Sequence, residues 1–115
     1  MDFEYVAILV TVDSVEQARK IADVLLEQRR AACVNIVPGV HSRFRWEGAI
    51  DTAEEAMLVI KTRSALVDEV TDLVRRNHPA DVAEVIALPI VGGNPEYLAW
   101  VDEETAKGPN RGETD

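Results

Sequence analysis

Three segments of this chain are rich in β-branched residues and apolar on both faces, and this feature limits the fold more than any other. They are FEYVAILVTV (residues 3–12), AMLVIKT (56–62) and EVIALPIV (84–91). Strands of this kind are typical of a sheet that is covered on both sides. Both faces of the sheet must therefore be covered by other parts of the structure.

Segments with helical spacing of apolar residues separate these strands. The first helix follows a capping residue, Asp13 or Ser14. The second is predicted to begin with Ser64 as its cap and to end at Asn77-His78-Pro79. The third follows Asn94, and a proline occupies its first position. The apolar residues of the first helix are Val15, Ala18, Ile21, Ala22 and Leu25.

A long hairpin is predicted between the first two helices. Its arms, residues 33–46 and 49–62, flank a turn at Glu47-Gly48, and each is more than twice the usual strand length of about five or six residues. Arms of this length extend beyond the core of a small subunit. We therefore expect Val37, Phe44 and Trp46 to contact a neighbouring subunit.

The resulting order is β-α-β-β-α-β-α, which predicts an α+β, ferredoxin-like split βαβ sandwich with an extended hairpin between its second and third strands. Right-handed crossovers place the first two helices on the same face of the sheet. The third helix is too short to cover the other face, so we expect other subunits to do so. Residues 1–106 are expected to form one domain, and residues 107–115 a disordered tail.

The net charge of −9 argues against nucleic acid or an anionic membrane as a partner. No apolar run reaches the roughly 18 residues of a membrane span. The first residues are acidic, unlike the basic start of a signal peptide, so a cytoplasmic location is expected. The single cysteine excludes a disulfide within the chain.

Several segments, taken in order across residues 5–104, resemble the CutA family, the divalent-cation tolerance proteins. They are ILVTVDSVEQARKIADVLLEQRRAACVNIVPG, WEG, LVIKT, NHP, EVIALPI and EYLAW. The resemblance implies a non-catalytic homotrimer, similar in architecture to the PII signalling proteins, that responds to metal ions. It implies no obligatory cofactor, with copper or another divalent cation as the bound ion. The chain departs from the family pattern at Ala49, Asn77, Ala80 and Ala83.

In the family, metal binding is linked to positions that correspond to Cys33 and His78. Thiolate ligands suit Cu(I), and imidazole suits copper and zinc. Both residues also have a structural interpretation, as a small buried side chain for cysteine and as a helix-terminal cation for histidine. The predicted topology places them at opposite ends of the sheet, too far apart to bind one ion. A strong site therefore needs another subunit or carboxylates, of which the candidates are Asp13, Asp81 and Glu84.

A second hypothesis is a PII-like signalling module that binds a small ligand or a protein partner at clefts between subunits. Lys61 and Glu55 are the candidate residues for such a cleft. The same two residues are the candidates for an unrecognised enzyme, but the chain has no phosphate-binding glycine loop and no G-x-S-x-G motif. His41, on the hairpin, is expected at an interface or in solvent.

Overall fold

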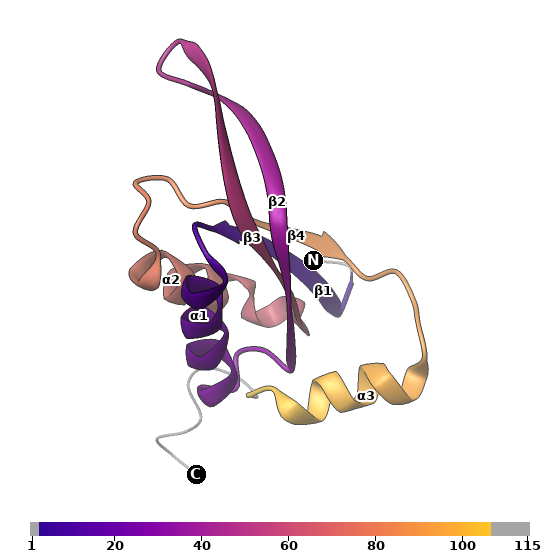
Figure 1. The fold of residues 1–115 in the computed structure, drawn as a ribbon. Helices are drawn as coiled ribbons and strands as arrows, with labels where there is room; N and C mark the ends of the chain where they lie inside the picture. Colours follow the sequence, from indigo (N-terminus) through magenta and orange to yellow (C-terminus); the bar gives the residue numbers. More distant parts are fainter. Residues whose placement is uncertain (1–2, 107–115) are drawn as a thin grey trace.

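The structure, a computed structural model, describes residues 3–106, which form one four-stranded sheet and three α-helices. The predicted order β-α-β-β-α-β-α is confirmed (Figure 1). None of the helices within these residues is long and apolar enough to cross a membrane. The predicted disordered tail, residues 107–115, lies outside the described part of the chain. The elements are β1 (Tyr5–Val12), α1 (Val15–Glu27), β2 (Cys33–Trp46), β3 (Ala49–Arg63), η1 (Ser64–Leu66), α2 (Val67–Asn77), β4 (Val85–Pro89) and α3 (Pro95–Glu104).

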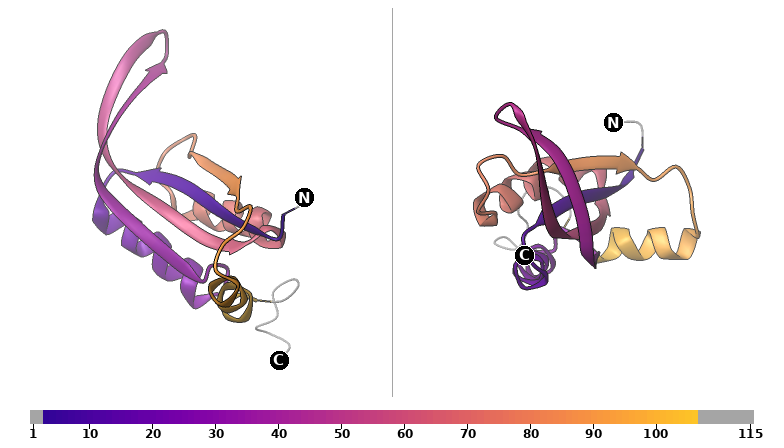
Figure 2. Two further views of the ribbon diagram at one scale, coloured as in Figure 1. Left: turned by 90° about the vertical axis from the view of Figure 1, so that its right-hand side faces the viewer. Right: turned by 45° about the horizontal axis from the view of Figure 1, so that its top comes forward.

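The strands are arranged in the order β2-β3-β1-β4, and each pair of neighbours is antiparallel. Because β3 lies between β1 and β2, the first βαβ unit is split, as predicted. The helices α1 and α2 lie side by side on one face of the sheet (Figures 1 and 2). We call this the helix face and the opposite side the open face.

Alternate residues of the two central strands point toward the helices and form the core. In β1, Val6, Ile8, Val10 and Val12 are fully buried. The matching residues of β3 are Ala56, Leu58, Ile60 and Thr62, and they pair in register with β1. The two helices complete this core with Ala18, Ile21, Leu25, Val70 and Val74.

Ser14, and not Asp13, caps the first helix. Its backbone is extended, and its hydroxyl accepts a hydrogen bond from the Gln17 N–H at 3.1 Å. This bond satisfies one of the N–H groups that a helix start leaves without a partner. Asn94 caps α3 in the same way, accepting from the Glu96 N–H at 3.0 Å.

Replacing Ser14 by alanine is expected to lower the free energy of unfolding by about 1 kcal/mol, because the Gln17 N–H loses its acceptor. Urea denaturation at one protein concentration measures the change. Asp13→Ala is the matched control, since Asp13 makes no cap hydrogen bond to α1. Equal losses in the two variants would contradict the assignment of the cap.

The prediction that Ser64 caps the second helix is wrong. Ser64 is the first residue of the short turn η1, and α2 begins only at Val67, without a side-chain cap. The Ser64 backbone N–H instead donates to the Glu4 carbonyl oxygen at 2.7 Å. This bond ties the end of β3 to the start of β1, and Leu66 is then buried in the core.

The hairpin β2–β3 projects beyond the rest of the molecule, as predicted (Figures 1 and 2). Between Val37 and Val40 the strand β2 advances three residues while β3 advances two, so one residue is extra. Gly39 takes up this β-bulge with a φ of 70°, a conformation that glycine adopts without strain. The bulge shifts the alternation of β2, so Phe44 and Trp46 continue on the same side of the hairpin as Val37.

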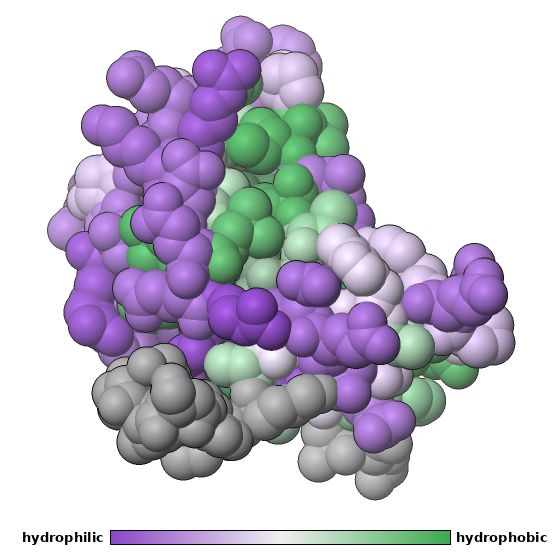
Figure 3. All heavy atoms as spheres, turned by 90° about the horizontal axis from the view of Figure 1, so that it is seen from below, coloured by the Kyte–Doolittle hydropathy of each residue, from purple (hydrophilic) through white to green (hydrophobic). Residues whose placement is uncertain are grey.

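The open face is apolar, and most of it lacks cover within the described residues. Ile86 and Leu88 of β4 are 48% and 47% exposed, and Val37, Phe44 and Trp46 are 40–46% exposed. In a space-filling view from below, hydrophobic side chains gather in a band between hydrophilic regions (Figure 3). Among residues 3–106, α3 covers one end of the open face, where Thr105 and Asp102 contact Arg63 of β3.

Candidate functional site

Two of the predicted metal-site residues meet at Thr11, near the end of β1. The Nε2 atom of His78, which follows α2, lies 2.8 Å from the Thr11 carbonyl oxygen. The Thr11 hydroxyl donates to the Glu84 Oε1 atom at 3.3 Å. The loop between α2 and β4 therefore brings one imidazole and one carboxylate to the same residue.

Both ring nitrogens of His78 have hydrogen-bond partners within the chain. The Ala80 backbone N–H donates to Nδ1 at 3.1 Å, so Nδ1 is the unprotonated nitrogen. The Nε2 atom therefore carries the hydrogen and donates it to the Thr11 carbonyl oxygen. A metal ion can bind this imidazole only if one of these hydrogen bonds is broken.

Cys33 lies elsewhere, at the start of β2 on the open face. It pairs in register with Lys61, which in turn pairs with Ala7 of β1. Ala7 and Thr11 are four residues apart on one strand, or about 13 Å. Within one chain, Cys33 therefore does not share a site with His78 and Glu84. Within residues 3–106, no group of three or more His, Cys, Asp or Glu side chains could hold a metal ion.

The Cys33 thiol is surrounded by polar side chains from three elements. Lys61 Nζ donates a hydrogen bond to the Asn35 Oδ1 atom. The Cys33 Sγ atom lies 4.0 Å from the same oxygen, at the long limit for sulfur. Tyr97 of α3 lies beside the Cys33 side chain. We call Cys33, Asn35, Lys61 and Tyr97 the Lys61 cluster.

Partial burial raises the pKa of Tyr97 above its ordinary value, and the charge and hydrogen bond of Cys33 raise it further. The phenol is therefore protonated at neutral pH and remains a hydrogen-bond donor. The Tyr97 ring also packs against Trp100, with 5.6 Å between the ring centroids. Together the two rings form an aromatic wall beside the Lys61 cluster.

Asn35 and Tyr97 were not among the residues that the sequence singled out. Strand alternation could have identified Asn35, because it is two residues after Cys33 and therefore on the same face. No sequence signal identifies Tyr97, because its contact with Cys33 depends on where α3 packs against the sheet.

Within one chain, Glu55 and Lys61 lie far apart on β3. Glu55 lies six residues earlier, about 20 Å away. It lines a separate cavity of about 360 Å³ at the base of the hairpin. The other residues of this cavity are Asp13, Ser14, Val15, Pro38, Gly39, Glu54 and Ala56.

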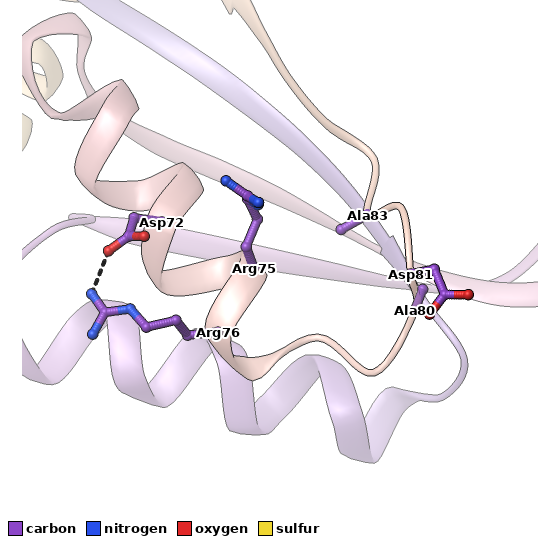
Figure 4. Close-up of a pocket in the computed structure, with 6 residues that line it drawn as sticks. All are labelled: Asp72, Arg75, Arg76, Ala80, Asp81 and Ala83. Atoms are coloured by element: carbon purple, nitrogen blue, oxygen red, sulfur yellow. Dashed lines mark hydrogen bonds and ion pairs between the residues drawn. The ribbon is translucent and has the colours of Figure 1, made fainter.

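Asp81 lines a cavity of about 290 Å³ beside the end of α2, and neither His78 nor Glu84 is among its lining residues (Figure 4). Arg76 forms an ion pair with Asp72 across one turn of the helix. Arg75 also projects from the last turn of α2 at this cavity (Figure 4). This cavity has mixed charge and contains none of the sulfur or imidazole ligands that copper prefers.

Comparison with known proteins gives a consistent result. The family model "CutA1 divalent ion tolerance protein" matches residues 6–104. The chain is 47% identical over 98 residues to the divalent-cation tolerance protein CutA of Thermus thermophilus, covering 85% of this chain and 95% of that protein. It is 47% identical over 100 residues to the chloroplastic protein CutA 1 of Oryza sativa, covering 87% of this chain.

The alignment with the rice protein spans 56% of that protein, so the chain matches a little over half of its length. The solved structure of CutA1 from Oryza sativa superposes with a TM-score of 0.89 at 44% identity. That superposition covers 92% of this chain and 97% of the rice structure. The similarity thus includes the sheet, the projecting hairpin and all three helices of the described residues.

Proposed function

Because this chain belongs to the CutA1 divalent ion tolerance protein family, we propose that it is a cytoplasmic homotrimer that binds copper or another divalent cation weakly. Proteins of this family are non-enzymatic and act in divalent-cation tolerance. The chain accordingly needs no catalytic residues and no obligatory cofactor. Its role is in the response to metal ions.

The observation that carries the metal-binding part is the approach of His78 and Glu84 to Thr11. Imidazole and carboxylate are both ligands for divalent transition metals. Two protein ligands, one of which must first lose a hydrogen bond, support only weak binding unless water or another subunit completes the site. Cys33 is a separate candidate, but the neighbouring Lys61 ammonium opposes a cation there.

The homotrimer is supported by the apolar open face and by the hairpin. Exposed apolar patches of this extent are typical of subunit interfaces. Val37, Phe44 and Trp46 lie on the same side of the hairpin as this face. These three residues are the proposed contacts of the hairpin with a neighbouring subunit.

Copper titration of the wild type and of His78→Ala, Glu84→Gln and Cys33→Ser tests the site. We expect His78→Ala and Glu84→Gln each to weaken binding at least about tenfold, which corresponds to about 1.4 kcal/mol for a lost ligand. Cys33→Ser reports on the thiol separately. Isothermal titration at constant protein concentration gives the dissociation constants.

His41→Ala is the matched control, because His41 is the other histidine of the chain and lies on the hairpin opposite Glu54. It is expected to leave copper affinity unchanged. Equal affinity in the wild type and all four variants would refute the site. A loss of copper affinity in His41→Ala alone would place the metal site on the hairpin.

A PII-like module that binds a small ligand is the second candidate function, and the Lys61 cluster is the observation that favours it. Lysine and tyrosine side chains can supply the few polar contacts that orient a small ligand. Thermal-shift measurements with nucleotides, small anions and metal ions separate the two functions. Stabilisation by nucleotides and not by metal would favour the PII-like function.

A further inference from the structure

We propose that the Lys61 cluster binds a small oxyanion, such as a phosphate or the carboxylate of a small organic acid. The inference rests on the proposed homotrimer, in which a second copy of the chain covers the open face. It is separate from the metal site, because the Lys61 cluster and Thr11 lie at opposite ends of β1.

The hydrogen bonds within the cluster leave donors without acceptors. The Tyr97 side chain lies beside the Cys33 sulfur, and the Cys33 thiol and the Lys61 ammonium both donate to Asn35 Oδ1. This single oxygen is therefore shared by two donors. Two N–H groups of Lys61 and two of the Asn35 amide have no acceptor within residues 3–106. A ligand that fits them must supply several acceptor oxygens.

The charges around the cluster also select an anion. Two rows of paired residues cross the open face from β2 to β4 and include the strand residues of the Lys61 cluster. Neither row contains aspartate or glutamate. The first row is Cys33, Lys61, Ala7 and Leu88, and the second is Asn35, Val59, Leu9 and Ile86. Lys61 is thus the one charged residue of these two rows, in a chain whose net charge is −9.

Arg63, two residues further along β3, shows how the fold itself neutralises a cation on this face. Its guanidinium is 3.8 Å from the Asp102 carboxylate of α3 and donates to the Thr105 hydroxyl. Lys61 has no such carboxylate among the described residues. Once a second subunit removes water from the open face, an ammonium without a counter-ion is strongly unfavourable. A bound oxyanion removes this penalty.

The aromatic wall favours a free ligand over a carboxylate side chain of the neighbouring subunit. Tyr97 and Trp100 are 39% and 40% exposed beside the cluster, so their rings can pack against the body of a small organic anion. Inorganic phosphate and benzoate are suitable probes, because both carry acceptor oxygens and only benzoate carries a ring. Stronger binding of benzoate identifies an organic acid, and stronger binding of phosphate identifies a phosphate group.

The test is thermal unfolding and isothermal titration of the full chain with each probe. At least one probe is expected to raise Tm by about 5 °C near saturation, since a ligand that binds only the folded state stabilises it. Lys61→Gln is expected to weaken this binding at least about tenfold. Lys20→Gln is the matched control, because Lys20 is exposed on α1, and it should bind the probe like the wild type.

Asn35→Asp is a second variant that keeps Lys61. It places a carboxylate against the ammonium, so the probe should be displaced while the subunit fold is retained. No binding by the wild type, or equal binding in all variants, overturns the oxyanion site. No probe binding together with weaker assembly of Lys61→Gln also overturns it and identifies a carboxylate of the neighbouring subunit as the partner.

Light scattering and copper titration of the same samples test the proposed function independently. A homotrimer that binds copper but neither probe refutes only the oxyanion site. A monomer that binds a probe through Lys61 refutes the homotrimer and retains the site.

Discussion

Ile86→Glu is expected to convert the protein from a homotrimer to a monomer at micromolar concentration. Ile86 is 48% exposed in one subunit, so the glutamate side chain of a monomer can reach water. In the proposed homotrimer the same position is covered, and burial of an unpaired carboxylate costs several kcal/mol. Each interface is then weakened on the order of a hundredfold or more. Light scattering coupled to size-exclusion chromatography measures the mass.

Leu26→Glu is the matched control for this experiment. Leu26 is a similarly exposed apolar residue, 39% exposed, but it lies on α1, away from the open face. This variant should retain the mass of the wild type. A homotrimer of Ile86→Glu, or a monomeric wild type, would show that the open face is not the interface.

Most of the fold could be predicted from the sequence because its signals are local. The apolar residues of α1 repeat at helical spacing, and their burial follows this pattern. Residues of β1 that point away from the helices, such as Ala7 and Leu9, are also apolar, which correctly indicated a sheet with a second apolar face. The capping residues show the limit of this approach. Ser14 and Ser64 are equally good caps by residue type, yet only Ser14 accepts the bond.

The candidate sites were less predictable because they depend on irregular segments. The separation of Cys33 and His78 followed from strand direction, which topology determines. The meeting of His78 and Glu84 at Thr11 depends on the path of residues 78–84, and no periodic pattern encodes that path. Tyr97 reaches Cys33 through the packing of a helix more than 60 residues later in the chain.

Among the substitutions proposed for stability measurements, Leu58→Ala is expected to lower the free energy of unfolding the most. The expected loss is about 3 kcal/mol or more, within the range for buried leucine residues replaced by alanine. Leu58 is fully buried in β3 and pairs with Val10 and Ile36. Its neighbours lie on two adjacent strands of the sheet, which cannot close over the missing atoms, so a cavity remains. Denaturant unfolding at fixed protein concentration measures the loss, because unfolding of an oligomer depends on concentration.

Leu26→Ala removes the same atoms from an exposed position and is expected to change the unfolding free energy by less than about 1 kcal/mol. The comparison isolates burial from the chemistry of the substitution. Similar losses in the two variants would mean that Leu58 is not enclosed by the helix face. Because Leu58 points toward α1 and α2, its replacement should leave the open face and the affinity of the Lys61 cluster for an oxyanion unchanged in the folded protein.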